Sequence, residues 1–453
     1  MSSKLGIILF FAVCLFFFSI GNYYNSDEGV ILNGAWRMYN GDQLYTDFFS
    51  FIAPASFWWT ELSFKLFGPS YFSARIFSVL LLALSIIAIY QITLFAGGSK
   101  FAALFGALMW FLGNIQNMVI INHNNHSSYF ASIGVLFVML ALSLNSTTYF
   151  FLAGLFVGIT TIFLQTKGLA LAFGFGGLIL GYVFAAKINA KSSIIFFGGC
   201  LTVPAAVFLI WDPIFLYETL IRWPQEHYLE INKVSYAGWF IVTGSFLAVS
   251  FFLFKMRRSI NIKAVLILAF TQFFMMLAAL TRPDLSHIFL ASFGLVVLSV
   301  LALEKYLPII VEFFGASQNI FKNLSIAALF LTVFYASLTF GAQAVGAESD
   351  FRSLLQGKRF SKIYAHPFLP GIYFELRLPS PYFYDFLLTG MYPENAFMEN
   401  FLKLKLENPE HIFVDYEMVQ KFGYNKANAL DSYIDGNYEA ANDFGALKVL
   451  RRK

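Results

Sequence analysis

Residues 72–95 read FSARIFSVLLLALSIIAIYQITLF, a mostly apolar stretch whose single charged residue is Arg75. A helix rises about 1.5 Å per residue, so roughly 20 such residues cross a hydrocarbon core that is about 30 Å thick. The whole chain has this character, with 58% hydrophobic and 12% charged residues, which excludes an ordinary soluble domain. The sequence therefore predicts an integral membrane protein.

Similar apolar runs recur along residues 1–345 and predict an all-α polytopic membrane protein with about eleven transmembrane helices. The third run is short and needs residues 115–121 to complete its crossing. Residues 308–314 are expected to lie in the membrane interface. The predicted spans are residues 5–20, 72–95, 101–112, 129–144, 149–164, 169–186, 194–211, 239–254, 264–280, 288–303 and 324–340.

The basic residues predict the orientation of these spans, because cytoplasmic connections retain Lys and Arg. With the N-terminus inside, the four charges within residues 255–263 stay in the cytoplasm, and the C-terminal segment lies outside, in a periplasmic or lumenal space. The residues assigned to the cytoplasmic side are Lys4, Lys100, Lys187, Lys191, Lys255, Arg257, Arg258, Lys263, Lys305 and Lys322.

The charge distribution and the two cysteines exclude two features, a nucleic-acid partner and a disulfide framework. The net charge of +4 is small for 453 residues, and the basic residues form no stripe, which argues against nucleic acid. Cys14 and Cys200 both fall inside predicted spans, where a thiol behaves as a small apolar side chain. No disulfide framework is implied.

Three external segments stand out from the short loops, namely residues 21–70, residues 212–236 and everything after residue 345, and functional groups are expected there. The outer loop at residues 21–70 contains a predicted helix from about Glu28 to Tyr39 and another from about Pro54 to Phe67. The apolar load of the second helix is typical of an interfacial helix lying on the membrane surface. After residue 345 charges and prolines return, so residues 346–453 are predicted to form a small soluble α/β domain outside the membrane.

Acidic candidates for chemistry lie in the outer loop. Asp27 and Glu28 directly follow the first span, where one carboxylate could act as a general base or bind a metal. The alternative is structural, with Asp27 capping a helix and Glu28 as a first-turn acid favoured by the helix dipole. Asp47, in the stretch Tyr45-Thr-Asp-Phe48, is a weaker candidate, because acids commonly solvate loops.

Cationic candidates are spread over distant parts of the chain. Lys167 lies in a short turn, where its ammonium could bind a lipid phosphate or extend to the interface. Arg282, Asp284 and His287 fall within six residues, and Arg and His suit phosphate recognition. The alternative is an ion pair of Arg282 with Asp284 that caps the next helix.

His123 and His126 have a spacing compatible with metal binding. Two histidines without an adjacent acid or cysteine make a poor metal site, so we expect a polar loop at residues 122–126.

These motifs together resemble the opening of the GT-C glycosyltransferases, polytopic enzymes that use polyprenyl-phosphate sugar donors. The similarity lies in a span, then the acidic pair Asp27-Glu28, then Gly41, the stretch 44–48 and Pro54. Residues 154–168, which end in Gln165-Thr-Lys-Gly168, and residues 282–287 are similar to motifs of the protein O-mannosyltransferase and lipid A aminoarabinose transferase branch. Residues 412–415 and the end of the chain resemble that branch's outer domain. The Trp-Trp-Asp-Tyr-Gly motif of oligosaccharyltransferases does not occur in the sequence.

The resemblance implies transfer of a sugar from a polyprenyl-phosphate carrier to an acceptor hydroxyl of a lipid, glycan or protein, with inversion. It also implies a bacterial inner (plasma) membrane, with residues 346–453 in the periplasm. Asp27 is then the expected base, and Glu28, the second expected catalytic residue, binds the acceptor or supports a metal. Lys167, Arg282 and His287 are expected to bind the donor phosphate. Asp47, Asp284 and Tyr45 are expected to bind acceptor or support the site. Family members differ in metal use, so the sequence leaves a divalent cation open.

The alternative from another class is a transporter or flippase of a lipid-linked sugar. A transporter places polar groups near the middle of the bilayer and uses interrupted helices, whereas the candidates here cluster on one membrane face. This clustering favours an enzyme.

Overall fold

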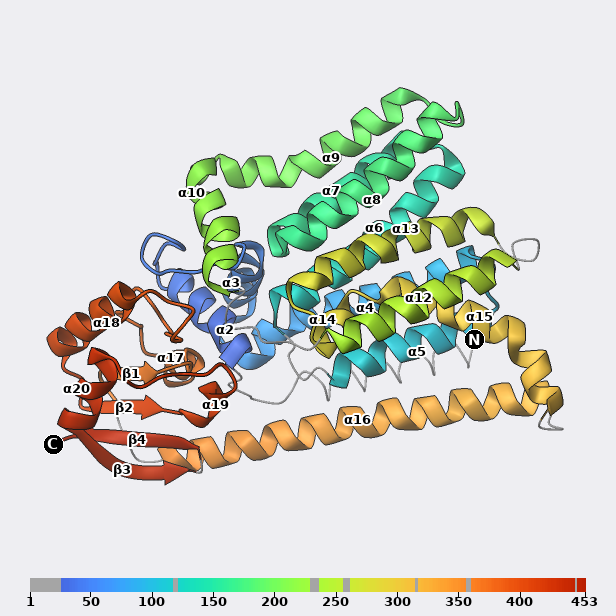
Figure 1. The fold of residues 1–453 in the computed structure, drawn as a ribbon. Coiled ribbons are helices and arrows are strands. Elements are labelled where there is room, and N and C mark those ends of the chain that lie inside the picture. Colours follow the sequence, from blue (N-terminus) through green and yellow to red (C-terminus); the bar gives the residue numbers. More distant parts are fainter. Residues whose placement is uncertain are drawn as a thin grey trace.

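The computed structural model describes residues 26–116, 121–228, 236–255, 261–313, 317–355, 360–444 and 446–453. The first predicted span, residues 5–20, lies outside the described residues. The fold is a bundle of long helices with a small mixed sheet at one end (Figure 1).

Most predicted spans are present as helices, because each apolar run satisfies its backbone hydrogen bonds internally. Within the described residues, seven helices are long and apolar enough to cross a membrane, and α5 and α7 are shorter apolar helices. The count of eleven is therefore not confirmed. The bundle helices are α4 (Tyr71–Phe95), α5 (Lys100–Gln116), α6 (His123–Leu144), α7 (Thr147–Phe163), α8 (Gln165–Phe184), α9 (Ala190–Phe208), α12 (Ala237–Lys255), α13 (Ile262–Ala278), α15 (Phe293–Phe313) and α16 (Gln318–Leu355).

The span predicted at residues 288–303 is wrong in its detail, because a break divides it. Helix α14 (Leu285–Leu290) ends before α15 begins at Phe293. Gln272 of α13 bridges this break, since its Nε2 donates to the Ala291 carbonyl at 3.2 Å and its Oε1 accepts from the Leu295 amide at 2.8 Å. Residues 308–314 are predicted to lie in the interface, but residues 308–313 continue α15, with Pro308 inside the helix, and residue 314 lies outside the described residues. Membrane-spanning helices tolerate an internal proline, because neighbouring groups can satisfy the backbone carbonyl that it frees.

The outer segments contain the two helices that the sequence predicts. Helix α2 (Ser26–Tyr39) and helix α3 (Ala55–Phe67) lie beside each other at one end of the bundle (Figure 1). Helix α10 (Pro213–Tyr217) continues into the π-helical turns η1 (Glu218–Arg222) and η2 (Pro224–Tyr228) at the same end. The short helix η4 (Ala279–Thr281) leads from α13 toward α14.

The C-terminal sheet has its own hydrophobic core, distinct from that of the bundle. Its strand order is β1-β2-β4-β3, with β1 parallel to β2 and the other pairs antiparallel. The strands are β1 (Ile363–His366), β2 (His411–Val414), β3 (Tyr438–Phe444) and β4 (Leu447–Arg452), and the helices are α17 (Gly371–Leu376), α18 (Glu394–Glu407), α19 (Glu417–Gln420) and α20 (Ala429–Asn437). The mix of helices and strands predicted for residues 346–453 is therefore present.

Helix α16 joins the two parts of the molecule. It runs from the end of the bundle farthest from α2 back to the sheet, through Val345 without interruption (Figure 1). The composition change at residue 345 therefore falls within a helix. Its 38 residues give a length of about 57 Å, well beyond one bilayer core.

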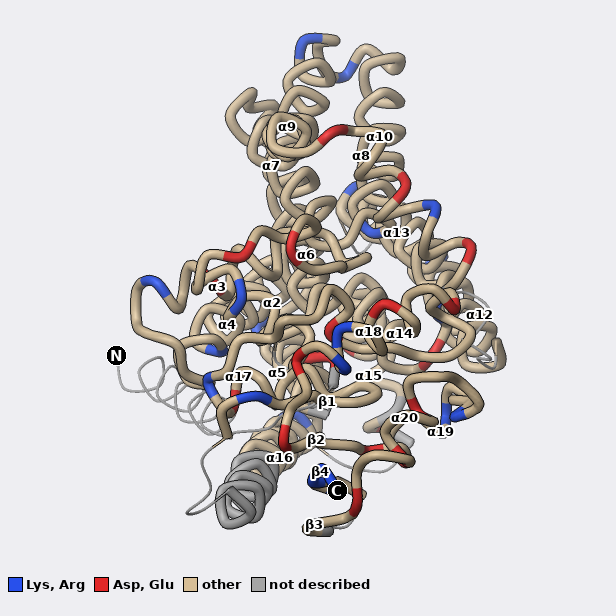
Figure 2. The backbone as a smooth tube through the Cα atoms, turned by 90° about the vertical axis from the view of Figure 1, so that its left-hand side faces the viewer, with Lys and Arg blue, Asp and Glu red and all other residues tan. Residues whose placement is uncertain are grey.

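The sheet part packs directly on α2. Gly29 lies so close to α17 that a Cβ atom there would be 2.7 Å from the Gly371 amide nitrogen. Trp36 Nε1 donates to the Leu378 carbonyl, and Arg37 pairs with Asp385. Viewed from this end, residues of both charge signs are interspersed over the outer elements (Figure 2). Helices α2 and α3 and the C-terminal part thus form one continuous structure at this end of the bundle.

Candidate active site

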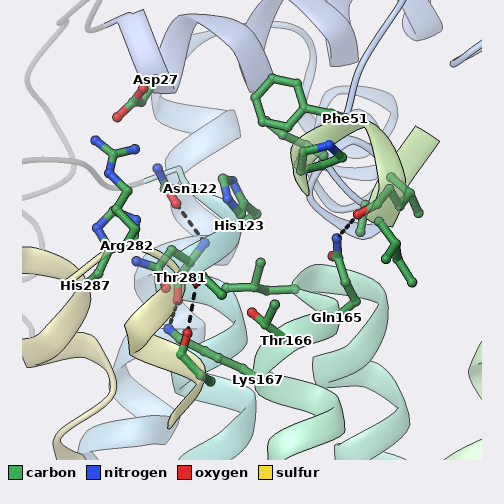
Figure 3. A pocket seen from close by; sticks show the side chains of 18 of the residues that line it. Asp27, Phe51, Asn122, His123, Gln165, Thr166, Lys167, Thr281, Arg282 and His287 are labelled. Carbon is green, nitrogen blue, oxygen red and sulfur yellow. Dashed lines mark hydrogen bonds between the residues drawn. The ribbon is translucent and has the colours of Figure 1, made fainter. Parts of the chain in front are cut away.

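A pocket of about 350 Å³ lies where the outer helices, the bundle and the C-terminal part meet. Four predicted site residues line it: Asp27, Lys167, Arg282 and His287 (Figure 3). They come from α2, α8 and the η4–α14 region, which are far apart in sequence. The fold therefore brings together the acid and the cations that the sequence singled out separately.

Asp27 lies in the first turn of α2, one residue after the helix begins, so it is a first-turn acid there. In Figure 3 its carboxylate lies on the same side of the pocket as the guanidinium of Arg282, which extends toward it. The side chain is partly exposed. Its carboxylate is thus accessible from the pocket.

Lys167 lies in the first turn of α8 and not in a connecting turn, because only Leu164 separates α7 from α8. The side chain is 3% exposed, which is contrary to the alternative that it extends to the interface. Its Nζ donates to the Asn124 carbonyl at 2.9 Å and to Ser128 Oγ at 2.5 Å. These contacts from α6 fix the ammonium at the inner end of the pocket (Figure 3).

Arg282 and His287 are both held by Asp284. Arg282 Nε donates to Asp284 Oδ2 at 2.9 Å, and His287 Nδ1 lies 2.7 Å from Oδ1. The same carboxylate caps α14 by accepting from the His287 amide at 2.9 Å. The predicted capping ion pair is therefore present, and it orients the two side chains that line the pocket. Asp284 itself does not line it.

Protonation in this cluster follows from burial and charge. Burial would raise the pKa of Asp284, but the hydrogen bonds from His287 and the charge of Arg282 lower it to about 2. Burial lowers the pKa of His287, and Arg282 lowers it further, although the hydrogen bond with Asp284 opposes this shift. At neutral pH the dyad therefore holds a carboxylate and a neutral imidazole.

The remaining predicted residues lie outside the lining. Glu28 is fully buried, and its two oxygens accept from Nε and Nη2 of Arg75 at 2.9 and 2.8 Å. Asp47 caps the Gln43 amide with its carboxylate at 2.7 Å. Tyr45 is buried, with its hydroxyl donating to the Ile52 carbonyl, and Ile52 does line the pocket. These residues hold the shape of the outer segment.

The two histidines are not in a loop, contrary to the prediction, because α6 begins at His123 with Asn122 as its cap. His126 is buried between Ser56, at 3.2 Å from Nδ1, and Ser78, at 2.7 Å from Nε2. His123 lines the pocket. Within the described residues, no group of three or more His, Cys, Asp or Glu side chains could hold a metal ion.

Most residues of the pocket wall were not predicted from the sequence. The polar residues Asn122, Asn124, Gln165 and Thr166 and the apolar residues Phe51, Phe368, Phe386, Leu388 and Met391 also line it. Gln165 Nε2 donates to the Leu220 carbonyl at 2.5 Å, which ties α8 to η1. Asn122 and Asn124 flank His123, so the spacing of His123 and His126 was the one feature of the sequence that pointed to this part of the wall.

The fold and the pocket define an integral membrane protein with a cation-rich pocket at one end of its helix bundle. Residues 52–212 match the sequence model of the family described as dolichyl-phosphate-mannose-protein mannosyltransferase. No curated protein sequence matches the chain.

Solved structures extend the likeness to nearly the whole chain. ArnT from Cupriavidus metallidurans bound to undecaprenyl phosphate is similar with a TM-score of 0.67 and 12% identity, covering 98% of this chain and 97% of that one. The apo state of the same ArnT is similar with a TM-score of 0.63 and 13% identity, covering 99% of this chain and 98% of that one. This protein therefore has the GT-C glycosyltransferase fold, which confirms the resemblance seen in its sequence.

Proposed function

We propose that this protein transfers a sugar from a polyprenyl-phosphate carrier to an acceptor hydroxyl at the outer face of the membrane, with inversion. The observation that carries the proposal is the shared pocket of Asp27, Lys167, Arg282 and His287. The ArnT structure of the same fold is bound to undecaprenyl phosphate, which supports a carrier of that class.

The cationic side chains of the pocket are suited to stabilising the phosphate leaving group. When the bond between the anomeric carbon and the phosphate oxygen breaks, its electron pair stays on the phosphate, which needs positive charge more than a proton. Lys167 and Arg282 supply that charge from two elements, and each is oriented by protein contacts before substrate arrives. Such preorganised groups stabilise developing charge without reorganising during the reaction.

Asp27 is suited to the role of general base. The acceptor oxygen forms the new bond to the anomeric carbon as its proton moves to the Asp27 carboxylate, so direct displacement needs one acid and no glycosyl-enzyme intermediate. Glu28, paired with Arg75, and Asp284, paired with Arg282 and His287, support the site by holding their neighbours in place. Asp47 and Tyr45 act in the same way on the outer loop.

The pocket's place at one end of the bundle supports an enzyme over the transporter alternative, since transporter sites lie near the bilayer midplane. Lys187, between α8 and α9, Lys255, the last residue of α12, and Lys263, in the first turn of α13, belong to the opposite end of the bundle (Figure 1). If that end is cytoplasmic, as the distribution of Lys and Arg favours, the pocket and the C-terminal part face the periplasm of a bacterial inner membrane. A reporter fused after Lys453 that works only outside the cytoplasm tests this orientation.

Donor binding tests the function. Charge-assisted phosphate contacts contribute roughly 1.5–3 kcal/mol, so Lys167→Ala and Arg282→Ala should each weaken binding of undecaprenyl phosphate by about tenfold or more. Lys322→Ala, in α16 at the far end of the bundle, is the control and should bind as the wild type does. Unchanged affinity in both pocket variants would refute the proposal. Mass spectrometry of lipid co-purified with the wild type identifies the carrier.

A further inference from the structure

A buried amide in the pocket has no role in the chemistry described so far. Asn124, the second residue of α6, is 3% exposed and lines the pocket. Its Oδ1 is buried and has no hydrogen-bond partner among the residues that the structure describes. Buried polar atoms in native proteins are nearly always paired, so an unpaired one on a side chain that lines a pocket calls for a ligand.

The main chain of Asn124 is fully engaged, which fixes the position of the amide. Its N–H donates to Asn122 Oδ1 at 2.7 Å. Its carbonyl accepts from Lys167 Nζ at 2.9 Å, from Ser127 Oγ at 2.8 Å and from Ser128 Oγ at 3.0 Å. The side chain is therefore held by a rigid helix start beside the ammonium assigned to the donor phosphate.

The chemistry of the amide oxygen selects its partner. An oxygen acceptor cannot bond to a phosphate oxygen that lacks a proton, so it requires an O–H or N–H donor. The group next to the phosphate in a polyprenyl-phosphate sugar is the sugar ring, which carries hydroxyl groups. We infer that Asn124 Oδ1 accepts a hydrogen bond from a hydroxyl of the transferred sugar, which makes Asn124 a specificity-determining residue. The inference rests on the proposed function.

A site built to bond a hydroxyl discriminates strongly, because an analogue without that group leaves the buried amide unpaired. Asn124→Leu keeps the approximate size of the side chain and removes the acceptor. It should leave the affinity for undecaprenyl phosphate unchanged, because that molecule carries no sugar. It should weaken binding of the glycosylated carrier by about tenfold or more. Removing an unpaired buried atom should leave the melting temperature of the ligand-free protein unchanged or raise it.

The experiment measures dissociation constants in nanodiscs for undecaprenyl phosphate and for undecaprenyl phosphate carrying glucose, mannose or 4-amino-4-deoxyarabinose. The readout is the dissociation constant of undecaprenyl phosphate divided by that of the glycosylated lipid that the wild type binds most tightly. Asn124→Leu should collapse this ratio toward one, whereas Asn124→Asp, which keeps an acceptor, should retain it even if its charge weakens both lipids.

Asn125→Leu is the matched control. Asn125 is equally buried, but its side chain bonds to Tyr129 and does not line the pocket. This variant should lower the melting temperature and keep the ratio. An unchanged ratio in Asn124→Leu, or an equal loss for both lipids, would overturn the inference alone. A wild type that binds none of the glycosylated lipids more tightly than undecaprenyl phosphate would also overturn it. Failure of the wild type to bind undecaprenyl phosphate would overturn the proposed function and this inference together.

Discussion

Arg37 of α2 and Asp385 of the C-terminal part form a buried ion pair, with 2.9 Å between Nη1 and Oδ1 and side chains that are 4% and 9% exposed. The same guanidinium donates to the Tyr382 carbonyl at 2.6 Å and to the Asp47 carbonyl at 2.9 Å. One side chain thus joins the outer loop to the segment that supplies Phe386 to the pocket.

Arg37→Ala should therefore damage both stability and activity. It leaves the Asp385 carboxylate buried without its partner, and breaking such a pair costs about 3–5 kcal/mol. We expect a clear fall in melting temperature and loss of sugar transfer. Arg451→Ala is the control, because its pair with Glu410 is 63% and 57% exposed and such pairs contribute about 0–1 kcal/mol. Equal melting temperatures for the two variants would contradict the role given to Arg37.

Close packing of α7 against α9 gives a second prediction. A Cβ atom at Gly158 would lie 2.6 Å from the Cys200 carbonyl oxygen, so the two backbones approach as small residues allow in membrane helix pairs. Gly158→Leu should destabilise the protein by roughly 1–3 kcal/mol through overpacking. Gly198→Leu on α9, where nothing lies within 4 Å, should be tolerated. Thermal unfolding in detergent compares the two, and a tolerated Gly158→Leu would mean that the helices are not packed this closely.

The Asp284–His287 dyad predicts a pH dependence of donor binding. Because burial holds the pKa of His287 below 6.5, its imidazole is neutral at pH 7.5, and with Nδ1–H directed at Asp284 the Nε2 atom carries no proton. Lowering the pH protonates Nε2 and adds a donor and a charge for the phosphate. The phosphate itself loses a charge at about pH 6, which weakens its binding to the cations. The affinity for undecaprenyl phosphate should therefore fall less below pH 6.5 in the wild type than in His287→Ala. An equal pH dependence in the two proteins would assign the dependence to another group.

Hydropathy accounts for the parts of the fold that the sequence predicted well. Spans such as α4 and the outer helices α2 and α3 follow from apolar runs, turn residues and caps, which are local properties. The break before α15 could not be predicted, because it depends on Gln272 of another helix satisfying two backbone groups. Hydropathy indicates whether a segment partitions into lipid. It carries no information on hydrogen bonds from a side chain of one helix to the backbone of another.

The candidate site likewise has residues that could be predicted from the sequence and pairings that could not. Asp27, Lys167, Arg282 and His287 could be singled out because ionisable groups near a bilayer are costly to place. The partner of Glu28 could not, since Arg75 reads in the sequence only as a charge tolerated at the start of a span. His126 likewise reads as a metal ligand or loop residue until Ser56 and Ser78 are seen around it. Pairings across distant segments are set by tertiary packing, which spacing does not encode.

The acidic pair at the start of α2 gives a prediction that separates its two members. Asp27 lines the pocket, whereas Glu28 is fully buried against Arg75. Glu28→Gln leaves the Arg75 guanidinium without its counter-charge, so it should cost about 3–5 kcal/mol and reduce activity by lowering the amount of folded protein. Asp27→Asn keeps the shape of the side chain at a partly exposed position and should leave the melting temperature close to that of the wild type.

Asp27→Asn should nevertheless lower the rate of sugar transfer by a factor of order 10² to 10⁴, because it removes the proton acceptor while the donor phosphate still meets Lys167 and Arg282. The measurement is single-turnover transfer by folded protein, with donor affinity and melting temperature determined on the same preparations. Asp47→Asn serves as the control, since Asp47 caps the Gln43 amide outside the pocket and the amide oxygen of asparagine can accept the same hydrogen bond. This variant should keep its supporting contact and retain transfer at near the wild-type rate. Near-normal transfer by Asp27→Asn would remove Asp27 from the mechanism, and a loss confined to folded Glu28→Gln protein would move the base by one residue.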